Sequence, residues 1–265
     1  MITSNANEKV KEIEKLGKQS KLRKEQKAFT VEGIRMFREV PPERIREIYY
    51  TSDAAVKYPE LKAELKNAES FAERIEEVTE GVMKKMSGTE TPQGILAVVK
   101  IVDYSVQDLI GEATETPFLL ILERLQDPGN LGTIIRMAEG AGVTGILLSA
   151  DSADHYSPKV VRSTMGSVLR MKVAVSEDIV EDVKKLREKG ITVFGTHLSG
   201  KEFYDEDFRG PSAFLIGNEG KGLTDELSRE ADKLVRIPMM GSVESLNAAI
   251  CASVVSYEVL RQRRG

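Results

Sequence analysis

The sequence predicts an α/β protein with two domains, the second built on a mostly parallel sheet with helices on both faces. The first observation is the unbroken apolar run over residues 118–122, which is typical of a strand buried on both faces. The second is the alternation of strand-like and helix-like stretches along the chain. The third is an acidic stretch over residues 103–116 that ends at Pro117. We therefore predict a small α/β domain at 1–102, a linker at 103–116 and a larger domain at 117–265.

The N-terminal region combines one charged helix with short strands and helices. Residues 1–27 are predicted to form the charged helix, and Pro41 and Pro42 end a later short helix because proline cannot continue the backbone hydrogen bonding. Strands are predicted at 29–33, 45–51 and 95–100, and helices at 34–40, 58–66 and 75–86. This alternation predicts a small α/β sandwich.

The C-terminal region continues the alternation over a longer stretch. Strands are predicted at 118–122, 145–149, 171–175, 191–196, 213–216 and 234–237, and helices at 131–141, 160–166, 179–189, 224–230 and 245–263. This order predicts a mostly parallel sheet with helices on both faces. Small ligands usually bind at the carboxyl ends of such strands. We therefore expect the loops after residues 216 and 237 to form the walls of one pocket.

Composition limits the classes of function. The chain has 265 residues, 41% hydrophobic and 30% charged, and no apolar run approaches the roughly 20 residues of a membrane span. Cys251 is the only cysteine, which excludes an internal disulfide and favours the cytoplasm. The two histidines, His155 and His197, lie far apart in the sequence, so we expect no metal site.

Positive charge is concentrated near the N-terminus, although the formal net charge is −4. Residues 9–27 hold eight basic and three acidic side chains. This local excess is a candidate face for nucleic-acid phosphates, and a solvated helix face explains it equally well. The candidate phosphate contacts are Lys18, Lys21, Arg23 and Lys24.

Candidate chemistry begins in the stretch 126–132, which leads into a predicted helix that carries Arg136. Asn130 suits a helix N-cap, which is the commonest structural role of an asparagine at a helix start. A fixed arginine beside a pocket suits a phosphate, which its planar guanidinium can bind through two hydrogen bonds. Read alone, this stretch fits a turn and an ordinary surface arginine better than it fits a site.

Two further stretches follow predicted strands near the C-terminus. Residues 217–222 are glycine-rich but have neither the spacing nor the hydroxyl residue of a P-loop, and the sequence has no dinucleotide-binding fingerprint. Glu219 in this stretch fits an exposed turn. Residues 245–247 precede a helix rich in small residues, which suits close packing, and Ser245 is a candidate cap of that helix.

Taken together and in this order, the three stretches resemble the signature motifs of the SpoU/TrmH class of RNA ribose 2′-O-methyltransferases, in the SPOUT superfamily. The motifs read Asp127-Pro128-x-Asn130-x-Gly132-x3-Arg136, Ile216-Gly217-x-Glu219-x-x-Gly222 and Ile237-Pro238-x6-Ser245-Leu246-Asn247. The resemblance spans about residues 117–265. Residues 29–33 and 91–100 resemble the RNA-binding domain often fused to these enzymes.

The resemblance implies a deep trefoil knot, S-adenosylmethionine as cofactor, and a homodimer with the C-terminal helix in its interface. The family's cofactor positions map to Gly195, Thr196, Gly217, Ile237 and Leu246. Its signature polar positions, our candidate catalytic residues, map to Asn130, Arg136, Glu219, Ser245 and Asn247. Arg136 is the family's proposed base. Because arginine stays protonated in proteins, we expect it to orient the hydroxyl and the adjacent phosphate.

The expected substrate is structured RNA, since only RNA offers a ribose 2′-hydroxyl. The resemblance favours 23S ribosomal RNA over transfer RNA. Two other interpretations stay open, namely an RNA-binding assembly factor that has lost turnover and an unrelated enzyme on a Rossmann-like sheet. All the polar motif residues are present, which argues against the first, and the missing nucleotide fingerprint argues against the second.

Overall fold

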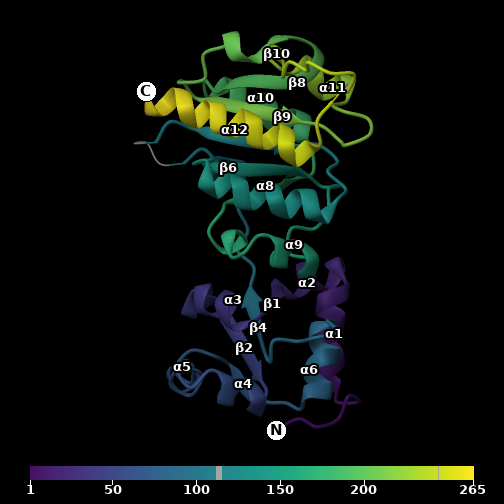
Figure 1. The fold of residues 1–265 in the computed structure, drawn as a ribbon, viewed down its shortest axis with the longest axis vertical. Helices are drawn as coiled ribbons and strands as arrows, with labels where there is room; N and C mark the ends of the chain where they lie inside the picture. The colour runs from purple at the N-terminus through teal and green to yellow at the C-terminus, as the bar shows by residue number, and fades with distance from the viewer. Residues whose placement is uncertain (112–114, 244) are drawn as a thin grey trace. The chain divides into compact units, whose positions relative to one another are not determined.

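In the computed structural model, which describes residues 1–111, 115–243 and 245–265, the chain forms two compact units (Figure 1). Unit 1 comprises Met1–Val102 and Tyr156–Leu169, and unit 2 comprises Asp103–His155 and Arg170–Gly265. Each unit has a sheet covered by helices, so the predicted α/β class is confirmed. Residues 112–114 of the expected linker lie outside the described residues.

The segment Tyr156–Leu169 packs with the N-terminal residues, although the sequence analysis places it in the C-terminal domain. The ring centroid of Tyr156 lies 4.5 Å from that of Phe29. Arg44 Nη1 donates to the carbonyl oxygen of Leu169 at 3.0 Å. An insertion in the C-terminal sequence therefore supplies part of the core of unit 1.

Unit 1 contains a four-stranded sheet of order β1-β4-β2-β3, in which β4 is antiparallel to both neighbours and β2 is parallel to β3. Its strands are β1 (Ala28–Glu32), β2 (Ile45–Tyr50), β3 (Arg74–Glu77) and β4 (Ile95–Lys100). One face packs on α1 (Glu8–Lys18) and α6 (Glu80–Ser87), and the other on α3 (Ile34–Glu39), α4 (Ser52–Lys57), α5 (Leu61–Ala68) and α9 (Pro158–Ser163). The remaining elements are α2 (Ser20–Gln26) and 3₁₀ turns at Pro42–Arg44 and Ser167–Leu169.

One expectation for unit 1 fails and one helix is not predicted, both at elements with little apolar pattern. The predicted helix over 75–86 is wrong in its first part, because Arg74–Glu77 pairs with β2 as the sheet's edge strand and α6 begins at Glu80. Acidic residues suit a helix, and they equally suit an edge strand whose charges discourage pairing with other chains. The sequence analysis also does not predict α4.

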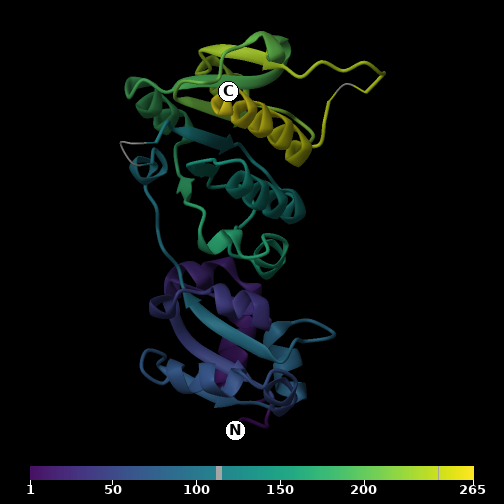
Figure 2. The ribbon, with the colours of Figure 1, turned by 60° about the vertical axis from the view of Figure 1, so that its left-hand side comes forward.

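Unit 2 contains a six-stranded sheet of order β10-β8-β9-β5-β6-β7, and every described pairing is parallel, as predicted. The strands are β5 (Phe118–Leu122), β6 (Gly145–Ser149), β7 (Val173–Ser176), β8 (Thr192–Glu202), β9 (Ser212–Ile216) and β10 (Lys233–Arg236). On one face α8 (Pro128–Gly140) and α12 (Ala248–Arg264) lie side by side (Figure 2). On the other lie α7 (Val106–Leu109), α10 (Ile179–Glu188) and α11 (Asp225–Arg229), and a 3₁₀ turn spans Phe203–Asp205.

Two helices of unit 2 are capped by residues other than those expected. Asp127, not Asn130, caps α8, because its carboxylate accepts the backbone N–H of Asn130 at 2.7 Å. Asn247, not Ser245, caps α12, and its side chain accepts two backbone N–H groups of the first turn. Both changes free a side chain, of Asn130 and of Ser245, for contacts other than helix capping.

The parallel sheet brings the carboxyl ends of β8, β9 and β10 to one edge, where their loops gather. That edge is where the site is built. No helix within the described ranges combines the length and the apolar character needed to cross a bilayer.

Candidate functional site

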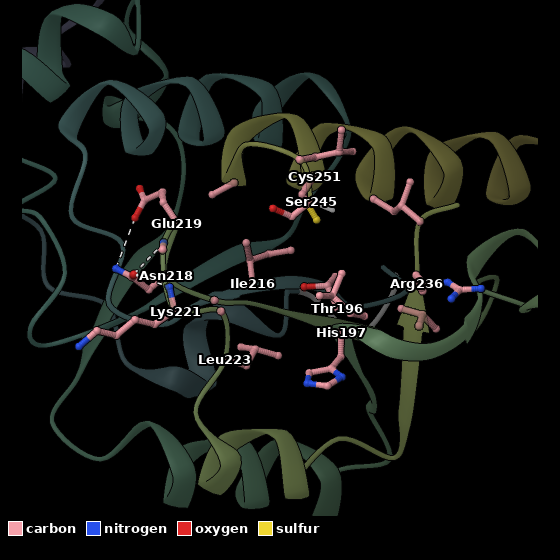
Figure 3. Close-up of a pocket in the computed structure, with 18 of the residues that line it drawn as sticks. Thr196, His197, Ile216, Asn218, Glu219, Lys221, Leu223, Arg236, Ser245 and Cys251 are labelled. Carbon is pink, nitrogen blue, oxygen red and sulfur yellow. Dashed lines mark hydrogen bonds between the residues drawn. The ribbon is translucent and has the colours of Figure 1, made fainter. Parts of the chain in front are cut away.

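A cavity of about 350 Å³ opens at the carboxyl ends of β8, β9 and β10 (Figure 3). Its walls are the middle of β8 with Thr196, the loop after β9, and the segment after β10 with Ile237. Cys251, in the first turn of α12, also lines it. The two expected loops therefore meet in one pocket, whose volume falls within the range of small-molecule sites.

Four of the five expected cofactor positions line this cavity, namely Thr196, Gly217, Ile237 and Leu246. Gly195 is buried and is not among the lining residues. A Cβ at Gly195 would lie 2.8 Å from Leu234 Cδ2, so this glycine lets β8 pack closely against β10.

Gly217 lets two backbone segments of the loop after β9 pack closely against each other. A Cβ there would lie 2.2 Å from both the carbonyl carbon of Gly222 and the backbone nitrogen of Leu223. The loop cannot open easily, because the backbones of Asn218 and Gly222 exchange hydrogen bonds of 3.0 and 2.9 Å. Gly222 has a φ of +67°, which favours glycine. The backbone itself therefore forms this side of the pocket.

A chain of hydrogen bonds joins the three motifs. Asn130 Nδ2 donates to Glu219 Oε1 at 3.1 Å. Asn247 Nδ2 donates to Asn130 Oδ1 at 3.0 Å. These contacts connect the start of α8, the loop after β9 and the cap of α12 across 89 and 117 residues of sequence. The side chain of Asn130 is thus held from both ends beside the pocket.

The other two expected catalytic residues are placed differently. Ser245 lines the cavity. Arg136 is exposed on α8 and is not among the lining residues. Within the part of the chain that the structure describes, Arg136 has no hydrogen-bond or ion-pair partner. Its side chain is therefore available to a ligand or to another molecule.

Sequence reasoning missed two residues that fix the glycine-rich loop. Glu123 is 4% exposed, and its carboxylate accepts the backbone N–H of Thr224 at 2.8 Å and the hydroxyl of Thr224 at 2.6 Å. Asn218 Oδ1 accepts the backbone N–H groups of Gly220 and Lys221 at 3.0 and 3.1 Å. The signal for Glu123 is an acidic residue directly after a five-residue apolar strand.

Cys251 is partly buried and lines the pocket. Burial raises the pKa of its thiol to about 11, against the opposite effect of a hydrogen bond with Thr196. The thiol is therefore protonated at neutral pH, and protonated thiols are poor nucleophiles. In the described ranges no group of three His, Cys, Asp or Glu side chains is arranged to hold a metal ion.

The candidate RNA contacts in unit 1 divide into exposed and buried residues. Lys24 is exposed, Lys18 pairs with Glu14 at 2.7 Å, and Lys21 lies 3.8 Å from Glu25. Arg23 departs from the expectation, because it is 4% exposed. Its guanidinium donates to the carbonyl oxygens of residues 16 and 17 at the end of α1, so it is occupied inside the unit.

Comparison with known proteins matches both parts of the chain. The SpoU rRNA Methylase family matches residues 117–257, and the MRM3-like substrate binding domain matches residues 7–97. The chain is 32% identical over 249 residues to the 23S rRNA (guanosine-2′-O-)-methyltransferase RlmB of Shewanella oneidensis, covering 92% of this chain and 100% of that protein. It is 33% identical over 261 residues to the 23S rRNA (guanosine(2553)-2′-O)-methyltransferase RlmP of Bacillus subtilis, covering 97% and 98%.

A solved structure is similar over nearly the whole length. The AdoMet-bound rRNA methyltransferase of Sinorhizobium meliloti is 32% identical, with a TM-score of 0.85. The match covers 98% of this chain and 97% of that one. The similarity therefore includes both the pocket and the N-terminal residues.

Proposed function

Because the chain belongs to the SpoU rRNA Methylase family, we propose that it transfers the methyl group of S-adenosylmethionine to the 2′-hydroxyl of a guanosine ribose in 23S ribosomal RNA. The observation that supports this proposal best is the hydrogen-bonded chain of Glu219, Asn130 and Asn247 beside the pocket. It joins one polar residue from each of three separated motifs at the place where a cofactor and a ribose can meet. A reaction on ribosomal RNA supports the proposal that the protein works in the cytoplasm.

The pocket suits S-adenosylmethionine in size and in chemistry. Its apolar walls include Ile216, Ile237 and Leu246, which suit an adenine ring, and Gly217 leaves the backbone accessible. Together with Thr196, these residues would hold the cofactor. When bound there, it supplies an electrophilic methyl group on a sulfonium.

The remaining chemistry concerns the nucleophile. A ribose hydroxyl is a weak nucleophile, so its position must be fixed and its proton accepted or shared. We assign Asn130 and Ser245 to orienting the ribose, and the hydrogen bonds from Asn130 to Glu219 and from Asn247 to Asn130 support this role for Asn130. Arg136 binds the hydroxyl oxygen and the neighbouring phosphate through its guanidinium N–H groups, and the hydroxyl proton is released to solvent as the methyl group moves from sulfur to oxygen. Such alignment contributes about 7–11 kcal/mol in well-oriented model reactions.

A homodimer explains why Arg136 lies outside the cavity of its own chain. Ile250 and Tyr257 of α12 are 53% and 52% exposed, and together with Val254 they form an apolar stripe at helical spacing. A Cβ at Gly140, one turn after Arg136, would lie 3.5 Å from the Tyr257 hydroxyl. Arg136 therefore borders this stripe. We infer that two copies pair through α8 and α12 and that each Arg136 serves the partner's pocket. The trefoil knot stays a prediction from the family.

Lys18, Lys21 and Lys24, which are exposed on α1 and α2, are assigned to RNA binding. The triple variant Lys18→Ala, Lys21→Ala, Lys24→Ala is expected to raise the KM for RNA about tenfold, because each lost phosphate contact weakens binding. The Kd of S-adenosylmethionine should not change. The matched control replaces Lys57, Lys62 and Lys66, which lie on α4 and α5 against the opposite face of the sheet. Equal effects of the two triple variants on the KM for RNA would contradict the assignment of Lys18, Lys21 and Lys24 to RNA binding.

The reaction itself is tested with methyl-labelled S-adenosylmethionine and unmodified 23S ribosomal RNA, with transfer RNA in a separate tube. We expect label in the ribosomal RNA. After alkaline digestion the label should remain in a dinucleotide, because a 2′-O-methyl group blocks cleavage of the next phosphodiester.

Each other outcome identifies a different function. Labelled mononucleotides would indicate base methylation, and label only in transfer RNA would change the substrate. If neither naked RNA is labelled, ribosomal particles are tested as the substrate. Absence of label there as well would indicate an RNA-binding assembly factor without turnover.

A further inference from the structure

Two positively charged side chains belong to the pocket wall. Lys221 and Arg236 both line the cavity and are exposed. Neither makes a hydrogen bond or an ion pair with its side chain in the described ranges. The carboxylate of Glu219, which also lines the cavity, already accepts a hydrogen bond from Asn130. Figure 3 shows Lys221 and Arg236 on opposite sides of the cavity.

The cofactor does not explain this pair of charges. S-adenosylmethionine carries a sulfonium, an ammonium and a single carboxylate, so its net charge at neutral pH is positive. Two unpaired cations beside a cationic ligand repel it unless an anion binds at the same place. The pocket wall is therefore complementary to an anionic second ligand.

The loop geometry places Lys221 near Glu219 and Asn130, on the side of the pocket that the proposed function assigns to the ribose. Asn218 Oδ1 accepts the backbone N–H of Lys221 at 3.1 Å, and Asn218 Nδ2 donates to the carbonyl oxygen of Arg124 at 2.9 Å. Lys221 thus projects from a turn with a fixed backbone. It lies two residues after Glu219, whose carboxylate holds Asn130.

Arg236 is placed on the other wall in a similar way. It is the last residue of β10 and directly precedes Ile237, which lines the cavity. Each cation therefore stands next to one partner of the reaction, Lys221 to the ribose side and Arg236 to the cofactor side. A nucleic-acid strand that crosses the cavity mouth carries phosphates at regular spacing toward both.

We propose that Lys221 and Arg236 bind backbone phosphates of the RNA strand on the two sides of the target nucleotide. The inference rests on the proposed function and assigns two contacts of its substrate. Phosphate contacts carry no sequence information. These two contacts would therefore fix the register of the strand and how far the ribose enters the pocket, and they would not select the base.

The test compares Lys221→Ala, Arg236→Ala and the double variant with the wild-type protein. We expect the double variant to raise the KM for RNA about tenfold at physiological salt. The slope of log K against log salt should fall by about 0.7–0.9 for each cation removed. The Kd of S-adenosylmethionine should stay unchanged, and Lys221→Arg should keep most of the RNA affinity. Lys189→Ala removes an exposed lysine of unit 2 outside the cavity and serves as the control.

Three results separate the possibilities. An unchanged salt slope in both single variants would overturn the proposal. A weaker cofactor Kd with unchanged RNA binding would also overturn it and assign the cations to the cofactor carboxylate. If the wild-type protein transfers no methyl group, the proposed function fails, and the salt slopes of RNA binding still decide whether these two residues contact phosphates.

Discussion

Gly217→Ala is expected to abolish the binding of S-adenosylmethionine, raising its Kd by about a hundredfold or more. The added Cβ would lie 2.2 Å from two backbone atoms, in Gly222 and Leu223. Backbone atoms cannot rotate away as a side chain can, so the loop must shift its wall of the pocket. Overpacking costs about 1–3 kcal/mol, and the upper end of that range corresponds to roughly a hundredfold in affinity.

Isothermal titration with S-adenosylmethionine measures the effect, and a thermal melt shows whether the fold is kept. Gly220→Ala is the matched control, because a Cβ there would have its nearest neighbour at 3.7 Å, in Asn218 Oδ1. It adds the same atom to the same loop and stiffens the unfolded chain in the same way. Near-equal affinities of the two variants would show that the close approach at Gly217 is not what shapes the pocket.

The strands of unit 2 were predictable because burial on both faces leaves only apolar residues. The run over Phe118–Leu122 is buried throughout, and its order with the following strands indicates a parallel sheet. Prediction failed where pairing with another segment decides the structure. Arg74–Glu77 becomes a strand only because β2 lies beside it. Tyr156–Leu169 joins unit 1 through contacts with residues more than a hundred positions away, which no local pattern encodes.

The site was predictable as a set of motifs but not as a network. The motifs named Asn130, Glu219 and Asn247, and the structure shows that one hydrogen-bonded chain connects them. Glu123 escaped notice because its function is to hold Thr224, and that contact spans 101 residues. Arg23 illustrates the opposite error, since composition counts a charge without showing that it is buried.

Arg136→Ala is expected to lower kcat/KM for RNA methylation by about 10²–10³. Removing one positioned donor from a developing charge typically has an effect of this size. The Kd of S-adenosylmethionine should not change, because Arg136 does not line the cavity. Arg136→Lys should recover only part of the activity, since an ammonium cannot make the paired hydrogen bonds of a guanidinium. Near-wild-type turnover of the alanine variant, with an intact fold, would contradict the assignment.

A heterodimer of Arg136→Ala with Gly217→Ala shows which chain supplies the arginine. The two variants are co-expressed with different tags and the mixed dimer is purified through both. If Arg136 serves the partner's pocket, one site of the mixed dimer combines an intact pocket with an intact arginine, while the other lacks both. Activity should then return to about half of the wild-type value, one site in two. If Arg136 serves the pocket of its own chain, each site lacks one part and the mixed dimer stays inactive. Because each variant alone is inactive for a different reason, recovered activity can come only from parts shared between two chains.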